Sequence, residues 1–219
     1  MIYEHDHKYL KKRNPSLYKD FKAPKHEIVN YFFYKNARKI ICQSSYHKKI
    51  LVQNLSLKNV INISGNLWSK KCLEKMRKLS KNDKQDKFSI LDSRTIHKNT
   101  AGAIKYCLKN NLEYELVKGS YTDFLESMSK NSKFVFLPKS PETLSRVIVE
   151  ARMLNCSVVT NQMVGATYEP WFQLKGEQLI DYMLNKRNEI FKTVEKIIDK
   201  NKIKRKRPLV SIVSTFFKG

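Results

Sequence analysis

The chain has 219 residues, 41% of them hydrophobic, and is long enough to fold around a sizeable core. It contains six glycines and neither a P-loop nor a glycine-rich dinucleotide motif, which disfavours those two modes of phosphate binding. No apolar run reaches the length of a membrane span and the N-terminus does not resemble a signal peptide, so the sequence predicts a soluble, cytoplasmic protein.

The net charge of +23 indicates an anionic partner, such as nucleic acid, a lipid surface or a phosphorylated ligand. The positive residues are mostly lysines spread along the chain, whereas nucleic-acid-binding proteins more often cluster them among aromatic side chains. An A+T-rich coding sequence also yields such a composition, and we favour this interpretation. The basic cluster at residues 202–207 is interpreted as a solvated linker, with contact to phosphate or acidic lipid as the alternative.

The first part of the chain is predicted to hold two helices and two short strands. Apolar residues at helical spacing predict a helix over residues 26–39, and "IICQ" predicts a buried strand over residues 39–43. A serine pair then caps a helix over residues 45–55. "NVINI", residues 59–63, is a second strand that leads into a glycine turn.

The rest of the chain alternates regularly between strands and helices. A lysine-rich stretch predicts a helix with a surface loop, and a long amphipathic helix is expected near the end. Between them, strands are predicted over residues 87–93, 112–120, 133–139 and 156–162, and helices over residues 99–111, 121–131 and 141–155. This order predicts an α/β fold with a doubly wound parallel sheet, in which ligands bind at the carboxyl ends of the strands.

Two glutamates stand out after the third of these strands. Glu142 and Glu150 have seven residues between them, follow a strand that ends in "FLPKSP", and precede "CSVV". Another motif, "SRTIHKN", places Arg94 and Lys98 after the first strand. In these features residues 37–172 resemble the C-terminal half of a family 4 glycosyltransferase of the GT-B fold, although serine and asparagine replace the glycines that flank the family's Arg–Lys loop.

The resemblance implies three parts. Residues 1–60 would be the remnant of an N-terminal acceptor domain with the passage between domains, and residues 61–200 a Rossmann-like domain that binds a nucleotide sugar. Residues 201–219 would be a basic linker and a truncated strand, because "RPLVSIVSTFF" resembles the start of a family 2 glycosyltransferase domain. We therefore expect a fragment or a shortened gene product, whose activity needs a longer parent or a partner chain.

The carboxylate of Glu150 has few polar neighbours in the sequence. Val147, Ile148 and Val149 precede it, and a carboxylate near a sheet is costly unless it is hydrogen-bonded. A ribose diol suits such an acceptor, and the resemblance assigns ribose to Glu150 and the hydroxyls of the donor sugar to Glu142. The alternative is an ordinary helix start with Glu142 near its positive end, and a surface charge at Glu150.

A phosphate site is predicted at the start of the same helix. The backbone amides of Thr143, Leu144 and Ser145 would open it, and a helix N-terminus is a ready anion site. Arg94 and Lys98 lie on the same rim, where the resemblance implies that they neutralise the leaving nucleoside diphosphate. The alternative is that Arg94 and Lys98 are two solvated cations in a lysine-rich protein.

Two further residues are candidates. His5, in "YEHDH", resembles a histidine that faces the donor, so His5 and Glu142 are the catalytic candidates. His5 and His7 would share one face of a strand, which a metal could use, but no third ligand is evident. Tyr121 follows a predicted strand end, where a nucleotide base could stack.

These residues predict an enzyme that transfers a sugar from a nucleotide-sugar donor to a glycan or a lipid-linked acceptor. The resemblance implies that no metal or other cofactor takes part, and the chain holds no Asp-x-Asp motif. Two alternatives stay open: a basic nucleic-acid-binding module, and a catalytically inactive scaffold of GT-B type. Contact with an anionic membrane surface is a further expectation, whereas nucleic acid is disfavoured.

Overall fold

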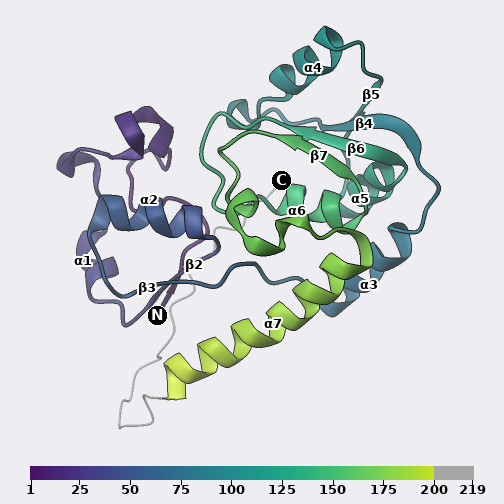
Figure 1. The fold of residues 1–219 in the computed structure, drawn as a ribbon. Coiled ribbons are helices and arrows are strands. Elements are labelled where there is room, and N and C mark those ends of the chain that lie inside the picture. The colour runs from purple at the N-terminus through teal and green to yellow at the C-terminus, as the bar shows by residue number, and fades with distance from the viewer. Residues whose placement is uncertain (200–219) are drawn as a thin grey trace.

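The structure, a computed structural model, describes residues 1–199, so the linker and strand predicted over residues 201–219 lie outside the described residues. Two parallel sheets organise the chain, as Figure 1 shows. We call residues 1–63 the N-lobe, residues 70–185 the C-lobe and residues 64–69 the joining segment. The predicted α/β class with doubly wound parallel sheets is confirmed.

The C-lobe sheet has the strand order β5-β4-β6-β7, and all its pairings are parallel. Its strands are β4 (Gln85–Leu91), β5 (Tyr114–Val117), β6 (Asn131–Phe136) and β7 (Ser157–Thr160). Its helices are α3 (Lys70–Leu79), α4 (Thr100–Lys109), α5 (Tyr121–Ser129) and α6 (Arg146–Met153). Helix α7 (Gly176–Asp199) begins in the C-lobe and extends beyond it. The strands and helices predicted here therefore exist. Most are shorter than predicted, and β4 and β6 begin two residues earlier than predicted.

Successive side chains of β6 point to opposite faces of the sheet, so the C-lobe core has one part on each face. Val135 packs with residues of α4 on one face, whereas Phe134 and Phe136 pack with α5 and α6 on the other. Because helices cover both faces, the strands are apolar nearly throughout. Residues at the carboxyl ends of β4 and β5 line one cavity together with the start of α6.

The N-lobe sheet has three short parallel strands in the order β1-β2-β3: Ile2–Tyr3, Ile40–Cys42 and Val60–Asn62. Helix α2 (Ser45–Leu55) follows β2, and the side chain of Ser44 accepts the hydrogen bond of an amide in its first turn. The two strands and the helix predicted after residue 39 are confirmed. In "YEHDH" only Tyr3 belongs to β1, and residues 4–7 lie in the loop that follows, so His5 and His7 do not share the face of a strand.

The helix predicted over residues 26–39 is wrong. A 3-10 turn at Lys25–Glu27 is followed by α1, which covers only Tyr31–Lys35. Between them Asn30 has φ 57°, in the left-handed region, and this breaks the helical path. Phe32, expected to face the core, is 73% exposed, and Tyr34 is the buried residue of α1.

Two segments connect the lobes. The joining segment leads from β3 to α3, and α7 runs back from the C-lobe to the N-lobe sheet (Figure 1). There Ile190 of α7 packs against Ile41 and Ile63. Within residues 1–199, no helix is both long and apolar enough to cross a membrane.

Candidate functional site

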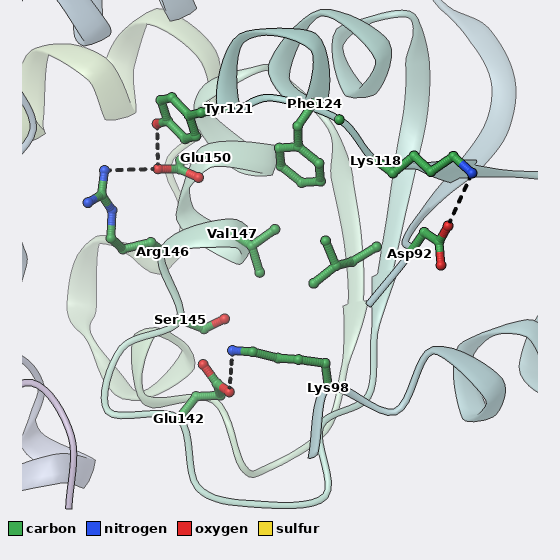
Figure 2. Close-up of a pocket in the computed structure, with 12 residues that line it drawn as sticks. Asp92, Lys98, Lys118, Tyr121, Phe124, Glu142, Ser145, Arg146, Val147 and Glu150 are labelled. Carbon is green, nitrogen blue, oxygen red and sulfur yellow. Dashed lines mark hydrogen bonds and ion pairs between the residues drawn. The ribbon is translucent and has the colours of Figure 1, made fainter. Parts of the chain in front are cut away.

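A cavity of about 590 Å³ lies at the carboxyl end of β4, between the starts of α5 and α6. We call it the main cavity, and Figure 2 shows its lining. A second cavity of about 410 Å³, the cleft cavity, shares Lys98, Glu142, Ser145 and Arg146 with it and adds residues of the N-lobe. The two cavities are therefore neighbours, and the second reaches the boundary between the lobes.

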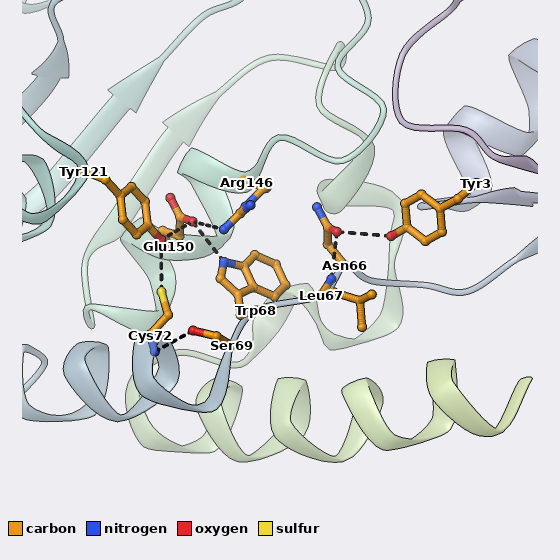
Figure 3. A network of polar contacts seen from close by, with 9 residues as sticks. All are labelled: Tyr3, Asn66, Leu67, Trp68, Ser69, Cys72, Tyr121, Arg146 and Glu150. Atoms are coloured by element: carbon orange, nitrogen blue, oxygen red, sulfur yellow. Dashed lines mark hydrogen bonds and ion pairs between the residues drawn. The ribbon is translucent and has the colours of Figure 1, made fainter. Parts of the chain in front are cut away.

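Glu150 is buried, with 3% of its surface exposed, in the wall of the main cavity. Its Oε1 accepts hydrogen bonds from Trp68 Nε1 at 2.9 Å and Tyr121 Oη at 2.7 Å, and Arg146 lies 3.3 Å away (Figure 3). Figure 2 shows the other carboxylate oxygen directed toward Phe124 and the cavity. The expectation that this carboxylate needs hydrogen-bond partners is confirmed, and protein groups supply them on one oxygen.

Tyr121 combines a hydrogen bond to Glu150 with a ring that lines the cavity and is 47% exposed. Burial and the neighbouring Glu150 carboxylate raise the pKa of Tyr121, so the phenol stays protonated and acts as a donor. Cys72 Sγ lies 3.2 Å from the same phenol oxygen. In this structure Tyr121 therefore orients Glu150, and its stacking on a base stays a prediction.

The carboxylate of Glu142 pairs with Lys98, whose Nζ lies 2.8 Å from its Oε1. Both line the main cavity and the cleft cavity. The lysine amine also lies 5.6 Å from the centre of the Phe136 ring. Because each charge partly neutralises the other, an anionic ligand would meet a lysine already held in position, and a hydroxyl group would meet both an acceptor and a donor.

The predicted start of the helix after Pro141 is wrong. Helix α6 begins at Arg146, and Ser145 precedes it with φ 69°. The backbone of Glu142 is instead paired with the loop after β7, since its N–H donates to the carbonyl oxygen of Met163 and its own carbonyl accepts from Gly165. This long-range pairing keeps the stretch before Ser145 out of the helix.

The amides of Thr143 and Leu144 therefore do not open α6, and the free first-turn amides are those of residues 146–148. Thr143 Oγ1 faces the N-lobe, at 2.8 Å from Gln43 Oε1. The hydroxyl of Ser145 is buried and has no hydrogen-bond partner within residues 1–199. In Figure 2 it points into the main cavity beside the Lys98 amine.

The two remaining candidates differ in position. His5 lines the cleft cavity, and its backbone carbonyl oxygen lies 3.1 Å from Thr143 Oγ1. Arg94 is exposed in the loop after β4 and lines neither cavity. Among residues 1–199, no three His, Cys, Asp or Glu side chains are grouped so that they could hold a metal ion.

Sequence reasoning missed three contributors, Trp68, Arg146 and Cys72. Trp68 is 82 positions from Glu150 in the chain, and Cys72 is 49 positions from Tyr121. Such distances leave no pattern of spacing in the sequence. Two signals were available. Arg146 and Glu150 are four residues apart, which brings them together on a helix. A buried indole N–H needs an acceptor, although this need does not say which acceptor.

No family model matches the sequence, and no curated protein matches it. Two solved structures of HepE from Anabaena are similar. The complex with UDP-glucose has 14% identity and a TM-score of 0.41, over 80% of this chain and 62% of HepE. The complex with UDP and glucose has 15% identity and a TM-score of 0.42, over 89% of this chain and 63% of HepE. The chain thus spans less than two thirds of the length of HepE.

Proposed function

We propose that the main cavity binds a nucleotide sugar and that the protein acts in sugar transfer. The observation that carries this proposal is the buried Ser145 hydroxyl, which has no partner within residues 1–199 and points into the cavity. A buried hydroxyl without a partner is unfavourable, and a ligand oxygen would relieve it. The same place holds the first turn of α6 and the amine of Lys98.

This end of the cavity suits a diphosphate. Free amides at a helix N-terminus, a hydroxyl and a lysine are donors that phosphate oxygens accept. During transfer, negative charge grows on the leaving nucleoside diphosphate, and fixed donors stabilise that charge. Ser145, Lys98 and the amides of residues 146–148 are the groups proposed for this task, and they need no metal for it.

The other end of the cavity suits a nucleoside. The second oxygen of Glu150 is available to accept hydrogen bonds from the two hydroxyls of a ribose. The exposed ring of Tyr121 offers a face for the base. Glu142, paired with Lys98, is proposed to contact the hydroxyls of the donor sugar, and His5 to face the same sugar from the cleft cavity.

The acceptor is proposed to be a glycan or a lipid-linked sugar that enters from the N-lobe side, where the cleft cavity opens. Arg94 is not part of this proposal, because it is exposed and lines neither cavity. The nucleic-acid-binding alternative lacks a comparable supporting observation. An inactive scaffold is the second candidate. Such a protein would bind the nucleotide sugar without transferring the sugar, so binding and transfer have to be measured separately.

Binding is tested by thermal shift and calorimetry with UDP, GDP and CDP sugars. A ligand that binds only the folded state raises its stability, so one nucleotide should raise the melting temperature selectively. We expect Glu150→Gln to weaken that binding roughly 10- to 100-fold, as for loss of a hydrogen bond to a charged group. The matched control is Glu126→Gln, which removes a lysine-paired carboxylate from the outer face of α5.

Three results would contradict the proposal. They are no stabilisation by any nucleotide sugar, equal effects of the two substitutions, and binding to DNA with a steep dependence on salt in place of nucleotide binding. A melting curve of each variant without ligand separates loss of binding from loss of folding. Incubation with candidate acceptors then tests transfer.

A further inference from the structure

We infer that α1 and the cations beside it form a surface that docks on an anionic lipid bilayer. The surface consists of Tyr31, Phe32 and Phe33 with the flanking Lys11, Lys12, Lys35 and Arg38, and we call it the docking surface. It belongs to the N-lobe and shares no residue with the main cavity. The inference therefore does not depend on the proposed function.

The aromatic part of the docking surface is unusually exposed. Tyr31 is 37% exposed, Phe32 73% and Phe33 45%, and the three are consecutive in the chain. Single exposed apolar residues are ordinary, whereas adjacent ones that remain uncovered mark a contact with a partner or a membrane. The exposure of three adjacent rings therefore needs an explanation, whereas a single exposed ring would not.

The chain holds these rings outward. The left-handed residue Asn30 starts α1 abruptly, and Tyr34 is the one buried residue in the helix. Its hydroxyl donates a hydrogen bond to Glu4, and its ring makes an edge contact with Tyr9 at 6.0 Å. Since Tyr34 fixes one side of α1 to the core, the preceding three aromatic residues project from the lobe.

Basic side chains flank the rings on both sides. The segment around Leu10 is bridged to Ile28, and the amide of Lys11 donates to the carbonyl oxygen of Glu27. This pairing brings the exposed Lys11 and Lys12 beside the chain that enters α1. At the other end of the helix, Lys35 and Arg38 are exposed.

The charge of the whole N-lobe has the same sign. Residues 1–60 contain thirteen lysines and arginines and four aspartates and glutamates. Exposed aromatic rings that enter the interface, surrounded by cations that face anionic headgroups, are the combination that holds a peripheral protein on a bilayer. Charge complementarity therefore selects an anionic surface over a neutral one.

Two other partners fit less well. The rings of Tyr31 and Phe32 are inclined by 75°, so they offer no common face on which successive nucleic-acid bases could stack. A second copy of the chain would bring together two lobes of the same strong positive charge, which repel one another. A lipid surface meets neither difficulty.

Co-sedimentation with vesicles tests the inference. We expect the full chain to bind vesicles of phosphatidylcholine with phosphatidylglycerol, and to bind phosphatidylcholine alone at least about tenfold more weakly, since surface potential adds to apolar insertion. Replacing both rings, Phe32→Ser with Phe33→Ser, should weaken binding to anionic vesicles at least about tenfold. Reversing two charges, Lys11→Glu with Lys35→Glu, should do the same and flatten the salt dependence.

Matched controls come from α4 of the C-lobe. Leu108, which is 62% exposed, controls for the loss of exposed apolar surface as Leu108→Ser. Lys105→Glu with Lys109→Glu controls for the change in net charge, because both lysines are exposed. These control variants should bind anionic vesicles within about twofold of the wild type.

The inference fails if the chain does not bind anionic vesicles, or if the α4 variants lose as much binding as the α1 variants. It also fails if the ring substitutions change the oligomeric state measured by light scattering, which would identify a second copy as the partner. Binding of an oligonucleotide that depends on the same rings would identify nucleic acid instead. Melting curves confirm that each variant is folded.

Discussion

The two lobes share a parallel α/β plan but differ in the groups they bury. The C-lobe sheet is covered by apolar side chains on both faces, and its buried Glu150 lies at the edge of the main cavity. The N-lobe buries Glu4, His7 and His47 within a much smaller core. The C-lobe thus buries Glu150 beside its cavity and Glu169 at the boundary with the N-lobe, whereas the N-lobe buries a carboxylate and two histidines together.

Burial shifts the pKa values of these carboxyl and imidazole groups in opposite directions. It raises the pKa of Glu4 to about 7 and lowers the pKa of His7 to about 4. The pKa of His47 is lowered as well, by burial and by the neighbouring His7. His7 Nε2 lies 3.3 Å from the carbonyl oxygen of Pro141, which can only accept, so Nε2 carries the proton; with a pKa of about 4 the ring is uncharged at neutral pH. The stability of the N-lobe should therefore depend on pH more strongly than that of the C-lobe.

The largest expected effect comes from the C-lobe core. Phe134 is fully buried on the central strand β6, and Phe134→Ala should reduce the free energy of unfolding by about 3–5 kcal/mol. The loss should be the same at about pH 5 and about pH 8, because no titratable group is involved. Urea denaturation measures it, with Leu116→Ala on the edge strand as the control. If the loss of stability in Phe134→Ala changed with pH, the proposed difference in pH dependence between the two lobes would be wrong.

Next in size is a change at Glu4. Its folded pKa lies above the unfolded value, so the wild type loses stability as pH rises from about 4.5 through about 7. Glu4→Gln removes this loss and should be more stable than the wild type by about 1–3 kcal/mol at about pH 8, with little difference at about pH 5. Urea denaturation at both values is the measurement.

His7 has the opposite effect on stability. Its folded pKa lies below the unfolded value, so the stability that it contributes is lost as pH falls from about 6.5 toward about 4. In the wild type the two residues partly offset each other. Glu4→Gln should therefore show a steeper loss of stability in acid than the wild type. A variant whose stability paralleled the wild type at every pH would show that Glu4 is not buried as described.

A smaller effect is expected where the joining segment meets the C-lobe. Trp68→Phe keeps a ring in place but removes the N–H that binds Glu150. The nucleotide affinity should fall a few-fold, about 1 kcal/mol, because Tyr121 and Arg146 still hold the same oxygen. Calorimetric titration measures this, and an unchanged affinity with a lower melting temperature would assign Trp68 a purely structural part.

The smallest effect belongs to Arg94. Since it is exposed and outside both cavities, Arg94→Ala should change stability by less than about 0.5 kcal/mol and nucleotide affinity by less than about twofold. Lys98→Met provides the comparison, because it removes a cation that lines both cavities and pairs with Glu142. If Arg94→Ala reduced the nucleotide affinity as much as Lys98→Met, Arg94 would belong to the binding site.

The sequence predicted the parts of the fold that depend on local patterns. The apolar strands of the C-lobe and the helix that begins at Tyr121 could be found this way. That helix carries a complete capping box between Ser120 and Asp123. Glu150 could also be recognised, because its apolar neighbours require partners for a buried carboxylate.

Features set by contacts distant in sequence could not be predicted. "SPE" has the composition of a helix start, but the pairing of Glu142 with Val164 draws it into a loop. The apolar spacing before residue 39 is helical, but Asn30 interrupts it and leaves Phe32 exposed. Arg146 shares α6 with Glu150, but Trp68 and Tyr121 come from elsewhere in the chain, so residue spacing could not reveal these two hydrogen bonds.

The joining segment and α7 touch one another where they pass between the lobes. A methyl group added at Gly65 would lie 2.9 Å from Cγ of Lys186, so the two connections meet at one place. Cγ is not the far end of the lysine side chain, so a larger residue at position 65 would have to displace α7 or the joining segment itself. Gly65 therefore sets how closely the two connections can lie, and it acts as a spacer between the lobes.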